Sequence, residues 1–292
     1  MHLQATATRA ATLLAKNPAL FCRVMLGKIK TARRMPPLPA WKRINDVVFE
    51  YDLAHYRGTA PMYFGSFAPL VIEAMKRHLR PGGVFIDVGA NIGYLSAVAA
   101  GLVGQRGEVH AFEPVPIYCD RLRRLAELNP RHKIVSNADA AGETPGTCTI
   151  YVTREPGQNT MVRSYQQPME IVSTLEVPVV RLDDYMEARQ IRRVSLLKID
   201  AEGFELPVLK GLERYFSSTR ERPPIICEIA PRAYALQGKK LADLAAYMSS
   251  HGYTARDLID PGTRVDLCGI KQVEDVLFMA SNENPRELSK QR

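Results

Sequence analysis

The feature that most constrains the fold is a regular alternation of short apolar segments with longer helical ones, which begins near residue 80. Residues 84–87, 108–113 and 133–137 have the length and composition of strands, and residues 94–103 and 116–128 those of helices. Such an alternation is typical of parallel βαβ units joined by right-handed crossovers. The sequence therefore predicts an α/β fold with a doubly wound, mostly parallel sheet.

The alternation is interrupted once, between residues 140 and 180. Two strand-like segments there, 147–152 and 176–180, enclose a polar loop at 155–165. We expect them to form a small β insertion at the rim of the site. Beyond it the pattern resumes, with predicted strands at 194–199, 224–229, 253–256 and 275–280 and predicted helices at 205–216 and 241–251.

The first 45 residues carry nine basic side chains and no acidic one, and without them the chain has 30 Lys and Arg against 31 Asp and Glu. Their apolar positions predict one or two amphipathic helices, interrupted at Pro18 and ended by the prolines of residues 35–39. The favoured interpretation is a helical cap packed on the main domain. The alternative is an arm that contacts an anionic surface, such as a membrane or an acidic substrate.

Other whole-chain features exclude several classes. Aromatic residues are sparse in the basic segment, so a specific nucleic-acid site is not expected. There is no apolar run of about 18 residues and hence no predicted membrane span. Five cysteines without a CxxC pair indicate free thiols in a reducing compartment, for which the cytoplasm is the expectation. The oligomeric state is not predicted.

The first chemical motif lies between a buried strand and a helix, where doubly wound sheets bind their ligands. It places Asp87 at the strand end, followed by Gly89, Asn91 and Gly93. Glycines there let the backbone approach a ligand, and Asp87 suits a cationic group. The spacing is GxxxG rather than GxGxxG, which argues against the rival function of a nicotinamide-dependent oxidoreductase.

Acidic and amide side chains also end the next two predicted strands. Glu113 could accept hydrogen bonds from a ribose diol, since an ionised carboxylate is only an acceptor. Its alternative role is that of an acid that caps the helix after Pro114. Asn137 or Asp139 follows the third strand, where an adenine edge would be read, although Asp139 could simply cap a turn.

A second motif delivers charges to the end of the apolar strand at 194–199. Asp200 and Glu202 could position a substrate hydroxyl, act as a general base or bind a divalent metal. Alternatively, Glu202 and Glu205 favour a helix N-terminus and pair with Lys198. Glu228 ends the following strand at the same sheet edge. A functional role for Asp200 is favoured, and no metal is assigned.

Together these motifs resemble the FkbM family of O-methyltransferases over about residues 84–228. The similar segments are FIDVGANIGYLS, HAFEP, VVRLDDYM, LLKIDAEGFELPVLKGL and ICEI, and residues 157–160 resemble the family's substrate-side loop. The resemblance implies a seven-stranded sheet of the Rossmann-like class I type with its last strand antiparallel. It also implies S-adenosylmethionine as cofactor and methyl transfer to a hydroxyl of a small molecule or glycan.

On this interpretation residues 1–60 form a basic helical extension, 61–281 the S-adenosylmethionine-binding domain and 282–292 a polar tail. The proposed catalytic residues are Asp200, Glu202 and Glu228. The proposed cofactor-binding residues are Asp87, Gly89, Asn91, Gly93, Glu113, Asn137 and Asp139.

Overall fold

The computed structural model describes residues 2–33, 40–51, 56–153, 161–162, 171–218 and 222–281. Two features predicted from the sequence, the substrate-side loop at 157–160 and the tail at 282–292, lie outside these residues.

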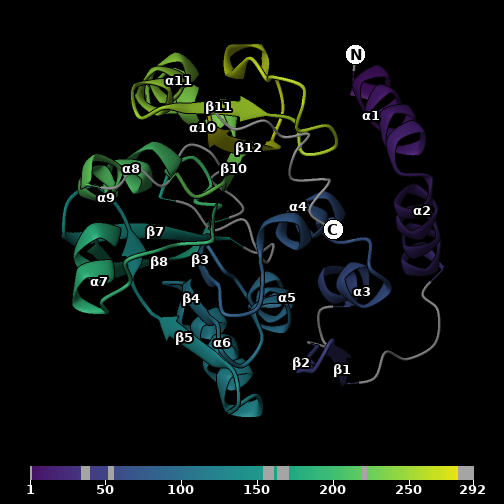
Figure 1. The fold of residues 1–292 in the computed structure, drawn as a ribbon, viewed down its shortest axis with the longest axis horizontal. Helices are drawn as coiled ribbons and strands as arrows, with labels where there is room; N and C mark the ends of the chain where they lie inside the picture. Colours follow the sequence, from purple (N-terminus) through teal and green to yellow (C-terminus); the bar gives the residue numbers. More distant parts are fainter. Residues whose placement is uncertain are drawn as a thin grey trace.

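The centre of the molecule is a seven-stranded sheet in the order β11-β12-β10-β9-β3-β4-β5 (Figure 1). Six strands run in the same direction, and β12, which lies between β10 and β11, is antiparallel to both. The predicted doubly wound sheet with an antiparallel last strand is therefore confirmed. The strands are β3 (Val84–Val88), β4 (Glu108–Phe112), β5 (Lys133–Asn137), β9 (Leu196–Ile199), β10 (Ile225–Ile229), β11 (Tyr253–Arg256) and β12 (Glu274–Ala280).

Helices cover both faces of the sheet, because successive strand side chains point to opposite faces and both faces are apolar. In β9, for example, Leu196 packs into one buried cluster and Leu197 and Ile199 into another. The first cluster includes α4 (Pro69–His78) and α5 (Tyr94–Val103). The second includes α7 (Leu182–Ala188), α8 (Glu205–Lys210), α9 (Glu213–Ser218) and α11 (Leu241–Ser250). The remaining helices of this part are α6 (Pro116–Leu128) and α10 (Pro231–Leu236).

One helix predicted from the sequence is two helices in the structure. The segment 205–216 divides into α8 and α9 at Gly211, whose backbone lies against the carbonyl oxygen of Gly142. A Cβ atom at Gly211 would lie only 2.4 Å from that oxygen. The close approach of a distant loop, rather than a local signal, explains the break.

The predicted β insertion is a separate three-stranded sheet. It consists of β6 (Ala140–Ala141), β7 (Gly146–Thr153) and β8 (Ile171–Val180), with β7 antiparallel and β6 parallel to β8. Val115, at the start of α6, packs into the apolar cluster of this small sheet. The insertion therefore lies beside the carboxyl end of β4.

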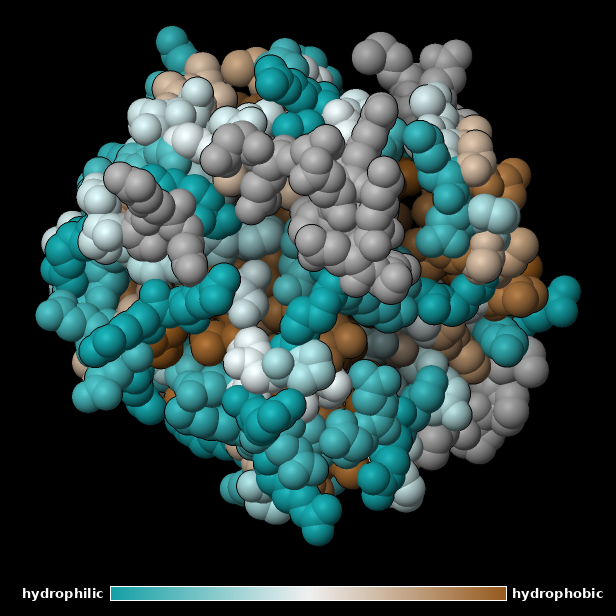
Figure 2. Space-filling view, viewed as in Figure 1, coloured by the Kyte–Doolittle hydropathy of each residue, from teal (hydrophilic) through white to brown (hydrophobic). Residues whose placement is uncertain are grey.

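The N-terminal segment forms the two predicted amphipathic helices, α1 (His2–Lys16) and α2 (Pro18–Ala32). Asn17 separates them, and its side chain accepts a hydrogen bond from the backbone N–H of Leu20. The two helices stack along one side of the molecule (Figure 1), where Figure 2 shows hydrophobic atoms at the right-hand edge. A hairpin, β1 (Trp41–Ile44) and β2 (Val47–Glu50), and helix α3 (Tyr56–Phe64) lead into the main domain.

Two whole-chain predictions can be compared with the described residues. All five cysteines are free thiols, as their spacing indicated. In the described ranges no helix has the length and apolar composition needed to cross a bilayer.

Candidate active site

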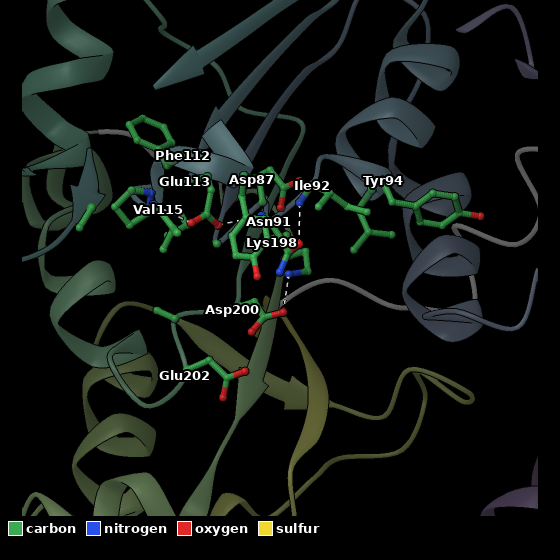
Figure 3. A pocket seen from close by; sticks show the side chains of 18 of the residues that line it. Asp87, Asn91, Ile92, Tyr94, Phe112, Glu113, Val115, Lys198, Asp200 and Glu202 are labelled. Carbon is green, nitrogen blue, oxygen red and sulfur yellow. Dashed lines mark hydrogen bonds and ion pairs between the residues drawn. The ribbon is translucent and has the colours of Figure 1, made fainter. Parts of the chain in front are cut away.

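A cavity of about 610 Å³ opens at the carboxyl ends of β3, β4 and β9 (Figure 3). This is the edge at which open α/β sheets bind ligands, and the volume suits a small molecule. Its walls combine the turn after β3, the loops after β4, β5 and β9, and part of the β insertion. Thr59, Met62 and Phe67 from the N-terminal region close one side.

Asp87 is the penultimate residue of β3, and its side chain is completely buried. Its Oδ2 accepts a hydrogen bond from the Ser96 hydroxyl at 2.6 Å, whereas its Oδ1 has no partner among the described residues. Burial raises the pKa of Asp87, although the Lys198 charge and the Ser96 hydrogen bond oppose that rise. A buried acceptor that lines a cavity without a partner is costly unless a ligand supplies a donor.

The two glycines of the motif both lie in close contact with other parts of the protein. Both have left-handed backbones, with φ of +76° at Gly89 and +83° at Gly93. A Cβ at Gly89 would lie 1.8 Å from the carbonyl oxygen of Asp200, and one at Gly93 would lie 2.6 Å from Leu122. Gly89 lines the cavity and Gly93 does not. The motif therefore needs glycine so that β9 and α6 can pack against the turn.

Glu113 follows β4 and is almost fully buried. Its Oε2 accepts a hydrogen bond from the N–H of Asn91 and its Oε1 one from the N–H of Val115, each at 2.9 Å. Val115 is the N-cap of α6, so Glu113 contacts the residue at which that helix begins. Burial raises the pKa of Glu113 to about 7, against these two hydrogen bonds. Asn91 itself has a left-handed backbone, and its Oδ1 accepts from the N–H of Ile92.

The structure separates the two residues predicted beyond β5. Asp139 lines the cavity, and burial raises its pKa. Asn137 does not line the cavity, because its amide donates to the backbone carbonyl of Ala111 at 3.1 Å. Of the two adenine-reading candidates, only Asp139 lies where a ligand could meet it.

Lys198 brings a positive charge to the end of β9. It is buried, and its ammonium donates to Oδ2 of Asp200 at 2.9 Å. Burial alone would lower the pKa of Lys198, but the charges of Asp200 and Asp87 raise it above its usual value. The ammonium therefore stays charged and connects the Asp87 end of the cavity to the Asp200 end.

Asp200, Glu202 and Glu228 come together at this second end, with Asp200 and Glu202 below Asp87 and Glu113 in Figure 3. One carboxylate oxygen from each lies within 4.8 Å of the others, a spacing that a divalent cation could bridge. Burial, followed by the charges of Asp200 and Glu205, raises the pKa of Glu202 to about 8. The pKa of Glu228 is also raised, chiefly by burial. Glu202 and Glu228 therefore hold their protons to a higher pH than exposed carboxyl groups do.

The turn that carries Glu202 is held by a residue whose role the sequence left open. Glu205 is completely buried in the first turn of α8, and its Oε1 accepts from the N–H of Gly203 at 2.8 Å. Gly203 has a φ of +100°, and Glu202 has a left-handed φ of +48°. Such a backbone costs energy in a non-glycine residue, so Glu205 stabilises a strained turn.

Sequence reasoning missed the apolar walls of the cavity, which no local motif marks. They come from separate segments, and only tertiary packing brings them together: Met62, Phe67, Ile117, Tyr118, Ile150 and Met161.

This order of strands, with β12 antiparallel and a cavity at the carboxyl ends of the central strands, defines a Rossmann-like class I methyltransferase fold. The chain belongs to the Methyltransferase FkbM domain family, whose sequence model matches residues 87–255. It is therefore a methyltransferase, and the resemblance found in the sequence is confirmed.

Individual relatives were also found. The chain is 29% identical over 211 residues to the 31-O-demethyl-FK506 methyltransferase FkbM of Streptomyces tacrolimicus. The match covers 63% of this chain and 77% of that methyltransferase. It is 24% identical over 148 residues to the hexuronic acid methyltransferase AglP of Haloferax volcanii, covering 51% and 57%. Against the crystal structure of methyltransferase FkbM from Methylobacillus flagellatus KT the TM-score is 0.41 at 18% identity, covering 88% of this chain and 58% of that one.

Proposed function

We propose that this methyltransferase uses S-adenosylmethionine and transfers its methyl group to a hydroxyl of a small molecule or glycan. The two relatives described above support this acceptor class by their names, which specify an FK506 derivative and a hexuronic acid. The observation that carries the proposal is the cavity itself, with cofactor-type partners at the Asp87 end and three carboxyl groups at the other. We also propose residues 61–281 as the catalytic domain and, from the five free thiols, a cytoplasmic location.

The residues at the first end fit the parts of S-adenosylmethionine. The unpartnered Oδ1 of Asp87 is an acceptor for its amino group. Tyr94 and Leu95, in the first turn of α5, line the cavity, and no side chain in the described ranges caps the N-terminus of this helix. The backbone N–H groups of that turn therefore suit the carboxylate of S-adenosylmethionine. Each carboxylate oxygen of Glu113 accepts one hydrogen bond from a backbone N–H group. Each oxygen keeps a further lone pair, which can accept a hydrogen bond from the ribose diol. Asp139 can accept from the adenine amino group.

When bound, this cofactor supplies an electrophilic methyl on a positively charged sulfur. The protein must then hold the acceptor oxygen in line with that methyl, about 3 Å away, and remove its proton. The cofactor would supply this methyl group and would leave as a neutral thioether, and Asp200, Glu202 and Glu228 line the part of the cavity where the acceptor hydroxyl would be held. The acceptor proton passes to a carboxylate of the protein.

We propose Glu202 as that base. A base is most effective when its pKa lies near the working pH, and the pKa of Glu202 is about 8. Asp200, the first choice from the sequence, already accepts a hydrogen bond from the buried ammonium of Lys198. We assign Asp200 to orienting the acceptor hydroxyl, with Glu228 completing the cluster.

Ligand-dependent thermal unfolding tests the cofactor assignment. A ligand present at about 100 times its Kd stabilises a protein by about 2.7 kcal/mol. We expect S-adenosylmethionine and S-adenosylhomocysteine to raise the melting temperature and NAD to leave it unchanged. Stabilisation by NAD alone would instead support the oxidoreductase. A panel of hydroxylated natural products and glycosides, assayed for release of S-adenosylhomocysteine, then tests the acceptor class.

A further inference from the structure

The outer face of α2 is apolar although it faces solvent. Met25, Leu26 and Ile29 are exposed large hydrophobic side chains, and Leu26 is 57% exposed. Their spacing places them on one face of the helix, opposite the buried residues Leu20 and Val24. In Figure 2 this side of the molecule shows hydrophobic atoms at its edge. We call the residues Met25, Leu26 and Ile29 the α2 stripe.

The stripe stays exposed while α2 is packed on the body of the protein. Gly27 lies so close to α3 that a Cβ there would be 2.8 Å from the carbonyl oxygen of Phe64. Arg23 pairs with Glu73 of α4 at 3.0 Å, and Lys16 at the end of α1 pairs with Asp260 at 3.0 Å. The cap interpretation is thus correct for the inner face of the helices, and it leaves the outer face without a role.

Basic side chains border the stripe. Lys28, Lys30 and Arg33 are exposed, and none of them forms an ion pair with any residue that the structure describes. At 100° per residue, Lys28 and Lys30 fall on opposite flanks of the stripe. No acidic residue precedes Asp46, so no side chain of this segment offsets their charge.

We propose that the α2 stripe docks on an anionic membrane surface, with α2 lying in the plane of the interface. An apolar face between basic flanks is the pattern of an interfacial helix, whose aliphatic side chains enter the lipid while lysines meet anionic headgroups. A second copy of this chain is a poorer partner, because facing stripes would bring like charges together. Nucleic acid is also a poorer partner, because it would leave three aliphatic side chains on a highly charged backbone.

Vesicle sedimentation with the full chain tests this proposal. We expect binding to vesicles of phosphatidylcholine mixed with phosphatidylserine, weakened by added salt, and little binding to phosphatidylcholine alone. Leu26→Glu should reduce the partition coefficient at least about tenfold, since it removes apolar burial and adds a repelled charge. Lys28→Ala combined with Lys30→Ala should reduce it about thirtyfold, at about fivefold per lysine.

Val172→Glu is the matched control, because Val172 is 55% exposed on β8 and the change introduces the same charge. It should bind vesicles like the unchanged protein, and thermal melts should show every variant folded. No binding to the anionic vesicles, or equal losses in Leu26→Glu and Val172→Glu, would overturn the proposal. Light scattering without vesicles would also overturn the proposal if it detected a dimer that Leu26→Glu dissociates. Binding to RNA in place of lipid would overturn it as well.

Discussion

Replacement of Glu113 by Gln separates the two roles that the structure gives this side chain. The carboxylate accepts N–H groups from Asn91 and Val115, and in the proposed function it also accepts the ribose hydroxyls. Glutamine keeps the shape but turns one acceptor into a donor and removes the charge.

For the free protein the two consequences nearly cancel. The pKa of Glu113 rises on folding from 4.5 to about 7, so its contribution to stability is lost as the pH rises through that window. At pH 8 the ionised side chain therefore costs the folded state about 3 kcal/mol, which glutamine relieves. Glutamine also loses one hydrogen bond to a charged acceptor, worth about 1.5–3 kcal/mol. We expect the free energy of unfolding at pH 8 to change by less than about 2 kcal/mol.

For the cofactor complex there is no such compensation. One ribose hydroxyl loses a charged acceptor, so the Kd for S-adenosylmethionine should rise about 10- to 100-fold. Calorimetric titration at pH 8 measures this Kd, and urea unfolding of the free protein measures stability. Glu127→Gln, an exposed change on α6, should alter neither quantity. A Kd within threefold of the original, accompanied by loss of stability, would refute the ribose role and leave Glu113 as a capping acid.

Four further outcomes follow from the same geometry. The Kd for S-adenosylmethionine should rise as pH falls below about 7, and titration of Glu113→Gln should show a weaker dependence, because Glu113 no longer contributes to it. Asp200→Asn and Glu202→Gln should each lower kcat about 100- to 10,000-fold, but only Glu202→Gln should abolish the loss of kcat/KM below about pH 8, since kcat/KM reports the pKa of the free protein. In urea unfolding, Gly89→Ala should lower the free energy of unfolding by about 4 kcal/mol or more, because the added Cβ would collide with the Asp200 carbonyl. Gly65→Ala, where the added Cβ meets open space, should lower it by only about 1–2 kcal/mol, because of the left-handed backbone alone. Turnover should survive dialysis against EDTA, because Lys198 supplies the cluster's positive charge; loss of activity restored by Mg²⁺ would contradict this.

The central sheet could be predicted because its signals are local. Each of its strands is a short apolar segment bounded by turn residues, and α5 and α6 have the bounds that the sequence pattern gave. Several of the elements that were missed carry weaker local signals, although the amphipathic helix α4, with ten residues, was also not predicted. The hairpin of β1 and β2 alternates too briefly, α7 and α10 have only seven and six residues, and the break at Gly211 depends on contact with Gly142.

The candidate site was predictable only to the extent that strand ends identify it. Topology brings Asp87, Glu113 and Asp200 to one sheet edge, and the sequence order of the strands was enough to foresee this. Side-chain direction was not foreseeable. Asn137 ends its strand as expected, yet its amide bonds the neighbouring backbone, and Gly93 serves the packing of α6. Hydrogen-bond partners of this kind are set by tertiary packing, which a single sequence does not display.

The charges of the cavity connect cofactor binding to acid–base chemistry. Burial and neighbouring carboxylates hold the pKa values of Glu113, Glu202 and Glu228 above their usual range, so at pH 7 the free protein retains more protons here than exposed carboxyl groups would. A cation that enters the cavity favours their ionised forms and lowers those pKa values. Binding of a sulfonium compound should therefore release protons and ionise Glu202. The base then becomes available when the methyl donor is present, and the acidic lining favours a positively charged ligand over a neutral one.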